Sequence, residues 1–400
     1  MSAWWAARSS GRWLRRKPMA VHTAAAVKRK PALPGLTGIR TFLAIGIMMF
    51  HFTPPLASFV RPVIDAGFTY ISFFLLISGF VLAYNYAHRA ETLRPMKFYG
   101  ARLSRLYPVY LLSLVVSFEM LQAEWKVRSL QEFVQGAFIT PLLMQGWSPS
   151  LATFWNTPAW TLSTEVMLYI AFPHIIRMKF WPRSAKKLLL LFGAFWLWEL
   201  LLPTLYTVLN PDGLHNIDRY SSGYWLRALK YTPLPFLPIF LAGVTLGRLH
   251  AVVELNDRVK LAMTLVAGGA VLAAFYLLVP RLPYVMLHGG LLTPVFAVLV
   301  WGLTGTHVIS RFLGWGPIGA FGRASLCLYL LHFNTYISLH NHHIPERLGV
   351  GAYDPWISYA FILCFSYAAF RLVEHPAQRY LLSRWVYREP NPPFVVNTPL

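Results

Sequence analysis

The feature that most constrains this chain is a series of apolar stretches, each about 17 to 22 residues long. A helix rises 1.5 Å per residue, so roughly 20 apolar residues cover the hydrocarbon core of a bilayer. Ten such stretches are present, at 38–56, 68–87, 106–122, 159–176, 188–208, 233–249, 261–280, 288–306, 318–339 and 355–372. The sequence therefore predicts an all-α polytopic membrane protein with about ten transmembrane helices.

Charge is distributed unevenly along the chain, which carries a formal net charge of +21 at pH 7. The segments on the N-terminal side of the predicted membrane contain 26 Lys and Arg residues, whereas the alternate loops contain 8. Loops rich in Lys and Arg stay in the cytoplasm, so both termini are predicted to be cytoplasmic. Because topology accounts for the positive charge, a lipid bilayer is the predicted partner and nucleic acid is not.

The chain divides into three predicted parts: a basic cytoplasmic arm at 1–33, a transmembrane domain at 34–382 and a cytoplasmic tail at 383–400. The first 30 residues contain eight Lys and Arg residues and no acid, which predicts a disordered arm lying on anionic lipid. The outer loop at 123–158 contains SLQEFVQGAFITPLL, which is predicted to form an interfacial or partly inserted helix. The alternative left open is that this segment forms a further span, which would change the topology of the chain.

Two ionisable residues lie inside the first apolar stretch, GLTGIRTFLAIGIMMFHF. Arg40 and His51 are 11 positions apart, which is about 1100° of helix rotation and a rise of ~16 Å. They therefore share one helix face at two depths, with Arg40 nearer the cytoplasm. This arrangement suits a ligand with an anionic head and a long arm, such as an acyl-CoA. The alternative is that Arg40 extends to the headgroups and His51 is a hydrogen-bonded packing residue.

Further polar residues lie at the ends of later stretches. Arg102 and Arg105 in KFYGARLSRLYPVY are neighbours on one helix face, where they form a phosphate clamp or only satisfy the topology. Glu165 follows Trp160 and Ser163 in TPAWTLSTEVMLYIAFP. Its carboxylate is suited to binding a sugar hydroxyl, orienting His51 or pairing with an arginine. Alternatively, it stabilises the helix N-terminus.

Two late segments contribute His332, in FGRASLCLYLLHFNTY, and Glu374, in FRLVEHPAQRY. Both are candidates for internal pairing or substrate contact, and both also fit ordinary polar residues near helix ends. The outer segment LHNHHIPERL holds three histidines, but no matching Cys or carboxylate cluster completes a tetrahedral set, so no metal site is predicted. The spacing of Gly243 and Gly247 in GVTLG favours close helix packing over phosphate binding. Cys327 and Cys364 lie in apolar runs and are predicted to be buried thiols.

Taken together and in this order, these segments resemble the integral-membrane acyltransferase 3 family. The resemblance rests on seven segments between residues 36 and 381, namely LTGIRTFLAIGIMMFH, FFLLISGF, RLSRLYPVY, PAWTLSTEVMLYIAFP, FLAGVTLGRL, GRASLCLYLLHF and VEHPAQRYL. The chain departs from the family pattern at Thr41, Thr161, Val166 and Asn334, where a glycine, a serine, a glutamate and a proline are frequent. None of these departures removes an ionisable residue that we predict to be catalytic.

The resemblance implies a ten-helix enzyme that transfers acyl groups, usually acetyl, to hydroxyls of carbohydrates such as lipopolysaccharide O-antigen, exopolysaccharide or peptidoglycan. It implies a multi-pass protein of the inner (plasma) membrane that uses acetyl-CoA or another acyl-CoA as donor and holds no cofactor or metal. By the same resemblance, Arg40 and His51 are the first-helix pair of the family and Arg102 and Arg105 contact the donor. Glu165 then occupies the acidic position of its Trp-Ser-Leu-Ser-x-Glu motif.

From the residues and the resemblance we predict His51 and Glu165 to be catalytic. The predicted substrate-binding residues are Arg40, Arg102, Arg105, Trp160, Ser163, His332 and Glu374. His51 acts either as a general base or as a transient acyl carrier, and Glu165 either orients His51 or holds the carbohydrate or glycolipid acceptor. Two other functions stay open at this point: a carrier or flippase for a lipid-linked or charged solute, and a non-catalytic membrane component of polysaccharide assembly.

Overall fold

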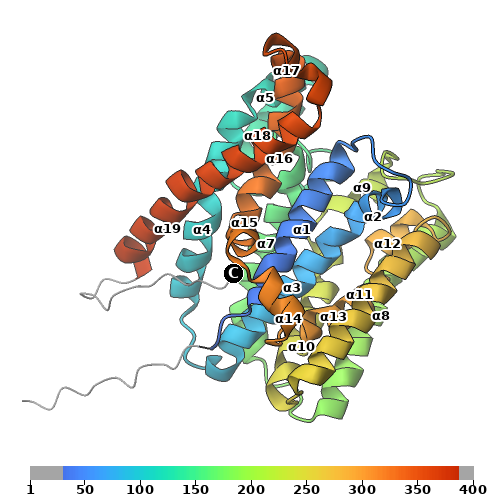
Figure 1. Ribbon diagram of the computed structural model, residues 1–400, viewed down its shortest axis with the longest axis vertical. Coiled ribbons are helices and arrows are strands. Elements are labelled where there is room, and N and C mark those ends of the chain that lie inside the picture. The colour runs from blue at the N-terminus through green and yellow to red at the C-terminus, as the bar shows by residue number, and fades with distance from the viewer. Residues whose placement is uncertain (1–29, 387–400) are drawn as a thin grey trace, which may run out of the picture. The chain divides into compact units, whose positions relative to one another are not determined.

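A computed structural model describes residues 30–386, and all regular elements in this range are helices. The prediction of an all-α chain is confirmed for this range (Figure 1). The predicted basic arm and cytoplasmic tail lie, over residues 1–29 and 387–400, outside the described residues.

The helices follow one another closely along the chain. In chain order the α-helices are α1 (Pro34–His51), α2 (Arg61–Asp65), α3 (Tyr70–Tyr86), α4 (Pro95–Val116), α5 (Phe118–Val127), α6 (Leu130–Ile139), α7 (Trp160–Arg177), α8 (Ala185–Leu209), α9 (Tyr224–Tyr231), α10 (Leu237–Val252), α11 (Asp257–Leu277), α12 (Tyr284–His288), α13 (Thr293–Gly302), α14 (Val308–Leu313), α15 (Gly316–Arg323), α16 (Ser325–Asn341), α17 (Ile344–Arg347), α18 (Trp356–Ala369) and α19 (His375–Leu381). Short 3-10 turns link several of them, and π-helical turns at Phe370–Glu374 and Leu382–Val386 extend α18 and α19.

Six helical segments in the described range are long and apolar enough to cross a membrane. They are Arg61–Arg89, Ala185–Leu209, Leu234–Val252, Asp257–Leu277, Tyr284–Gly302 and Trp356–Trp385. A seventh is obtained if α4 and α5, which meet at an angle of 61°, form one bent span. The chain is therefore a membrane protein by the length and hydropathy of these segments.

The three remaining predicted spans correspond to α1, α7 and α16, which have 18, 18 and 17 residues. Polar residues lower the mean hydropathy of α1 and α7, and α16 is shorter than the six segments above. These are also the helices that carry His51, Glu165 and His332. The count of ten spans and the cytoplasmic position of both termini stay predictions.

The segment at 123–158 contains a helix, as the sequence predicts. Ser129 caps α6, and its hydroxyl and the Glu132 carboxylate bond reciprocally to the backbone N–H groups of Glu132 and Ser129. With 10 residues, α6 is about 15 Å long and too short to cross the hydrocarbon core. Val134 and Phe138 are more than half exposed, which fits a helix lying at an interface.

The centre of the fold is the contact between α3 and α10. A Cβ atom at Gly243 would collide with the carbonyl oxygen of Leu76, and one at Gly79 would collide with that of Phe240. At Gly247 a Cβ would lie 2.7 Å from the Phe80 carbonyl oxygen. The prediction that GVTLG allows close helix packing is therefore confirmed.

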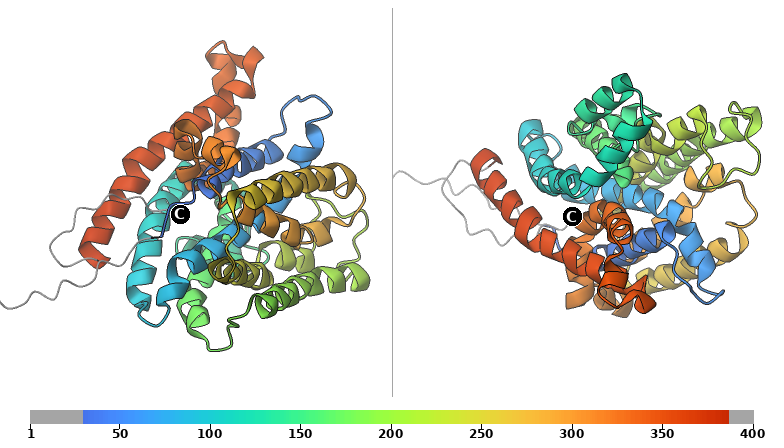
Figure 2. Two further views of the ribbon diagram at one scale, coloured as in Figure 1. Left: turned by 60° about the horizontal axis from the view of Figure 1, so that its bottom comes forward. Right: turned by 90° about the horizontal axis from the view of Figure 1, so that it is seen from above.

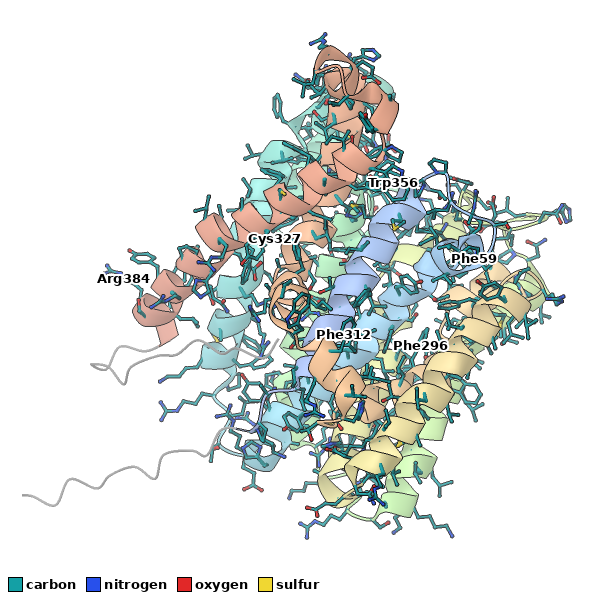
Figure 3. The ribbon with its side chains drawn as sticks, in the orientation of Figure 1. Phe59, Phe296, Phe312, Cys327, Trp356 and Arg384 are labelled. Carbon is teal, nitrogen blue, oxygen red and sulfur yellow. The ribbon has the colours of Figure 1, made fainter. Side chains whose placement is uncertain are left out.

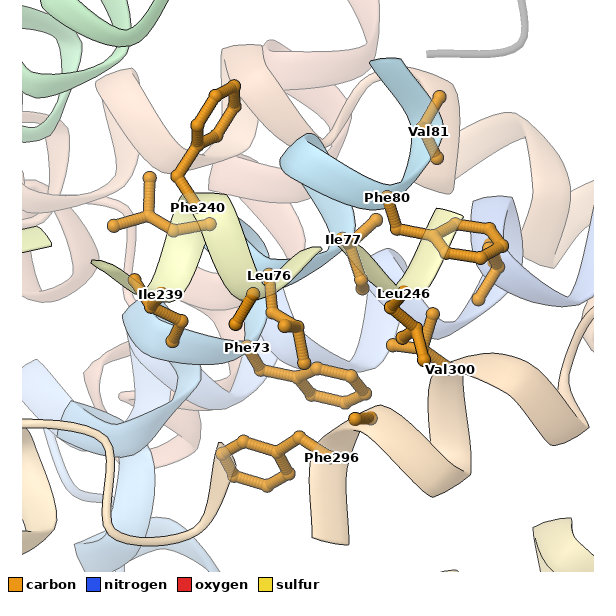
Figure 4. Packing of buried hydrophobic residues seen from close by; sticks show 14 of the residues in the cluster. Phe73, Leu76, Ile77, Phe80, Val81, Ile239, Phe240, Leu246, Phe296 and Val300 are labelled. Atoms are coloured by element: carbon orange, nitrogen blue, oxygen red, sulfur yellow. The ribbon is translucent and has the colours of Figure 1, made fainter. Parts of the chain in front are cut away.

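Aromatic side chains extend this centre toward α13. Phe73 of α3 stacks on Phe296 of α13 with ring centroids 4.7 Å apart (Figure 4). Leu76, Phe80 and Phe240 lie in the same cluster and are fully buried. Most of α3 is thus surrounded by protein.

The outermost helices present apolar side chains away from the protein. The helix that begins at Trp356 and ends near Arg384 lies along one edge, in contact with α4 (Figures 1, 2 and 3). Its surface includes Cys364, so the prediction of a buried thiol is wrong there and holds for Cys327. Exposed apolar residues of α8 and α11 include Leu189, Leu190, Leu197, Val208, Leu265, Val266 and Leu272. Such surfaces suit contact with lipid chains.

Candidate active site

Helix α1 is fixed against its neighbours by close backbone contact. A Cβ at Gly38 would collide with the Leu313 carbonyl oxygen, and the Thr41 hydroxyl donates to the Ile318 carbonyl oxygen over 2.7 Å. Thr41, where the family frequently has glycine, thus anchors α1 to α15. Arg40 and His51 project from this immobilised helix, His51 being its last residue.

A cavity of about 330 Å³ lies at the His51 end of α1. Its volume is at the low end of the range for small-molecule sites. The lining includes His51, Trp160, Arg219, Lys230 and Tyr284, which come from α1, α7, the segment before α9, α9 and α12. His51 keeps an exposed surface, so its imidazole is accessible to a molecule in the cavity.

His332 of α16 lies directly beside His51. The two ring centroids are 5.4 Å apart, and His332 is fully buried. Its Nδ1 lies 2.8 Å from the Tyr329 carbonyl oxygen and 3.2 Å from that of Leu328. Because a carbonyl oxygen only accepts, Nδ1 carries the proton and Nε2 of the neutral ring is an acceptor. That Nε2 is buried and has no hydrogen-bond partner among the described residues.

A second group of charged residues, here called the arginine cluster, comprises Arg40, Arg102, Arg105, Glu165 and Glu374. The charges of Arg105, Glu165 and Glu374 act on Arg40, so α1, α4, α7 and the π-turn after α18 meet here. Arg105 Nε lies 3.5 Å from Glu374 Oε1. Three guanidinium groups face two carboxylates, which leaves an excess of positive charge.

Aromatic and sulfur groups surround the arginine cluster. Arg102 donates to the Tyr86 hydroxyl over 3.3 Å, and its guanidinium lies 5.3 Å from the Phe98 ring centroid. The Tyr169 hydroxyl donates to Glu165 over 3.4 Å. The Cys327 thiol donates to Glu374 over 3.0 Å. These contacts hold the charged groups in place inside the helix bundle.

The predicted site residues therefore separate into two groups. His51, Trp160 and His332 lie at or beside the cavity, whereas Glu165 lies with the arginines. Of the roles considered for Glu165, the contacts favour pairing with arginine over orienting His51. The Ser163 hydroxyl accepts from the Gly146 backbone N–H over 3.2 Å, so this residue holds the segment before α7 and does not line the cavity.

Several cavity residues have no signal in the family segments. Arg219 and Lys230 come from the segment between α8 and α10, and Tyr284 and His288 come from α12. Tertiary packing brings these residues to the cavity that His51 also lines. The aromatic run RYSSGYW at 219–225 does not single them out, because such rings suit a membrane interface equally well.

The three histidines of LHNHHIPERL do not gather around one point. His340 Nε2 lies 2.7 Å from Asp354, and His342 Nε2 lies 3.5 Å from Glu119. Within residues 30–386, no three His, Cys, Asp or Glu side chains form a group suited to holding a metal ion.

Comparisons with known proteins show which family this chain belongs to. It is 23% identical over 374 residues to the O-acetyltransferase OatA of Staphylococcus aureus, an alignment that covers 87% of this chain and 57% of the relative. It is 27% identical over 169 residues to the acyltransferase MdmB of Streptomyces mycarofaciens, covering 39% of this chain and 41% of that protein. The chain thus spans little more than half the length of the first relative and less than half the length of the second. No solved structure matches the chain significantly. The acyltransferase domain of the acyltransferase 3 family matches residues 33–372, and because this is most of the chain, the protein belongs to that family.

Proposed function

We propose that this protein transfers an acetyl group from acetyl-CoA to a hydroxyl of a cell-envelope or exported carbohydrate, at the inner membrane. The observation that carries the proposal is the position of His51, which borders the cavity and lies on the same helix as Arg40 of the arginine cluster. Membership of an acyltransferase family and a relative named O-acetyltransferase support the reaction class.

The arginine cluster supplies the donor site in this proposal. Arg40 and Arg102 bind the phosphates of CoA in this proposal, because guanidinium groups bind phosphate oxygens in a bidentate manner. Arg40 and His51 are separated by ~16 Å of helix. The pantetheine arm of CoA covers that separation along α1 and brings the thioester to His51.

His51 serves as the general base. Its neutral imidazole takes the proton of the acceptor hydroxyl while that oxygen attacks the thioester carbonyl carbon. A C–O bond forms, the C–S bond breaks and its electron pair leaves with sulfur, and the proton passes from His51 to the CoA thiolate. In this mechanism Nε2 of His332, which has no hydrogen-bond partner among the described residues, receives the other N–H of His51 once the acceptor is bound and so orients that ring.

The test is acyl transfer by purified protein in liposomes with labelled acetyl-CoA and a glycan acceptor. His51→Ala is expected to lower the transfer rate by about 10² to 10⁴-fold, the contribution typical of a general base. His342→Ala, at an exposed histidine that faces Glu119 and lies outside both groups, is the matched control and should retain activity. Normal transfer by a folded His51→Ala protein would overturn the mechanism.

The same assay separates the alternatives. Solute movement without release of CoA would identify a carrier. Neither transfer nor movement, in protein shown to be folded, would favour a non-catalytic role in polysaccharide assembly.

A further inference from the structure

The cavity beside His51 contains two cations that have no carboxylate partner. Arg219 and Lys230 both line it, and no Asp or Glu side chain is among its lining residues in the described chain. Neither residue forms an ion pair within residues 30–386. Arg219 is half-buried and Lys230 is buried, and a cation withdrawn from water in this way is costly unless a counter-charge or several hydrogen bonds compensate.

Arg219 is held rigidly by neutral groups. It donates over 2.6 Å to the Phe50 carbonyl oxygen, one residue before His51, and over 2.6 Å to the Tyr220 hydroxyl. Its guanidinium lies 4.7 Å from the ring centroids of both Phe50 and Tyr220. This residue is therefore tied to the end of the helix that carries the proposed base.

Lys230 is almost completely buried, at 4% exposure. Its ammonium group donates to the carbonyl oxygens of Arg219, over 3.0 Å, and Ser221, over 3.5 Å. The nearby Asp218 carboxylate is instead engaged by the Ser221 hydroxyl and by the backbone N–H groups of Tyr220 and Ser221. An ammonium has three donors, so a cavity ligand can receive the third.

We propose that the cavity binds the acceptor through an anionic group seated between Arg219 and Lys230, so that the acceptor is an acidic or phosphorylated saccharide. This inference rests on the proposed function and specifies its substrate class. The shared chemistry is a carboxylate or phosphate oxygen, which both cations bind with charge-assisted hydrogen bonds. Arg219 is hydrogen-bonded to Phe50, the residue before His51. An anion bound by Arg219 is therefore held close to His51 and to the hydroxyl that His51 deprotonates.

Aromatic rings supply the rest of the cavity. Trp160 packs edge-on against Tyr231 with centroids 5.3 Å apart, and Tyr284 lies 5.2 Å from the Lys230 ammonium. Rings of this kind bury the apolar faces of sugars while their polar edges hydrogen-bond. A cavity with two cations, several rings and no carboxylate is therefore complementary to an anionic sugar.

The first experiment compares three probes in liposomes with labelled acetyl-CoA: methyl glucoside, methyl glucuronide and glucose 1-phosphate. The neutral probe should be acetylated with a kcat/KM at least about tenfold lower than the better anionic probe. Preference for the glucuronide or for the phosphate identifies the source of the anion. Equal use of all three would overturn the inference while leaving the proposed function intact.

Variants locate the anion. Arg219→Gln and Lys230→Gln should each raise the KM for the preferred anionic probe by about tenfold, and Lys230→Arg, which keeps the charge, should recover part of that loss. The KM for acetyl-CoA should not change. A raised KM for acetyl-CoA instead would mean that the cavity holds donor phosphates, which would also overturn the inference.

A second measurement decides the case in which none of the three sugars is acetylated. Membranes of the producing cell are incubated with labelled acetyl-CoA, and the labelled glycan is applied to an anion exchanger, with membranes containing His51→Ala protein as background. Retention and elution with salt are expected, and an unretained labelled glycan overturns the inference. Absence of any His51-dependent label would contradict the proposed function itself.

Discussion

At the scale of single residues, His51 and His332 form a pair with unequal surroundings. His51 faces the cavity, whereas His332 is buried and donates its Nδ1 proton to backbone carbonyl oxygens of its own helix. The buried ring has one nitrogen left, and that nitrogen can only accept while the ring is neutral. On the proposed mechanism, His332 is therefore a positioning residue for His51.

We expect His332→Ala to lower kcat by about tenfold or more, because the His51 ring loses its orienting acceptor. The KM for acetyl-CoA should stay near the parent value, since the arginine cluster is untouched. His332→Gln offers an amide oxygen as acceptor and should recover part of the rate. Steady-state kinetics test this, and a changed KM with unchanged kcat would assign His332 to substrate binding.

The second residue-scale prediction concerns pH. Burial lowers the pKa of Lys230 to about 8, the charge of Arg227 acts in the same direction, and Asp218 opposes them. The charged and titratable groups facing Lys230 are Arg219, Arg227, Asp218, Tyr231, Tyr284 and His288. Lys230 loses its charge as the pH rises through 8, so the KM for an anionic acceptor should increase there. Lys230→Arg should remove that increase, and a KM profile that is the same in both proteins would contradict the assignment.

The third residue-scale prediction concerns the ion pair between Arg105 and Glu374, whose side chains are 15% and 2% exposed. Glu374→Ala leaves a buried guanidinium without this partner and should cost about 3 to 5 kcal/mol of stability. Asp65→Ala removes the exposed pair with Arg61 and should cost at most about 1 kcal/mol. Thermal unfolding in detergent compares the stabilities of the two variants. Equal losses of stability would show that burial does not set the contribution of the Arg105–Glu374 pair.

At the scale of helices, the close contact between α3 and α10 depends on residues without side chains. Gly243 faces the backbone of α3 with no room for a Cβ, whereas Gly268 of α11 has nothing within 4 Å of a Cβ. Two glycines in apolar helices thus have opposite surroundings. The two glycines spaced four residues apart in GVTLG distinguish the first in the sequence, because Gly268 has no glycine four residues away.

Gly243→Leu should separate α3 from α10 and destabilise the protein by roughly 1 to 3 kcal/mol or more, the cost typical of overpacking. Gly268→Leu adds a side chain to an open surface and should be nearly neutral. Melting temperatures of the two variants in the same detergent are the measurement. A stable Gly243→Leu protein would mean that the two helices readily move apart.

At the scale of the whole molecule, the predicted topology rests on the distribution of Lys and Arg. Cysteines placed at Asn216 and at Lys179 lie in loops predicted to be on opposite sides of the membrane. A membrane-impermeant maleimide should label Asn216→Cys in intact cells and Lys179→Cys only after permeabilisation. Replacing the exposed Cys364 by Ser removes the background, since Cys327 is buried. Labelling of both loops from the same side would refute the predicted topology.

The sequence predicts the parts of this molecule that depend on local pattern. Apolar length locates the helices, and the spacing of Arg40 and His51 places both on one inward-facing helix. The approach of Arg219 and Lys230 to His51 could not be predicted, because it arises from contacts between loops and helices far apart in the chain. The position of Glu165 among arginines is likewise a product of tertiary packing, which a motif alone does not specify.

On the proposed function, helix α1 also determines how long the acyl donor must be. Arg40 and His51 are held on one immobilised helix, so the separation between the phosphate-binding group and the base does not adapt to the ligand. A compact donor such as acetyl phosphate reaches one of the two positions but not both. On the proposed function, the helix therefore selects donors by their reach, and an enzyme of this design ignores small reactive acyl compounds that share the cytoplasm with acetyl-CoA.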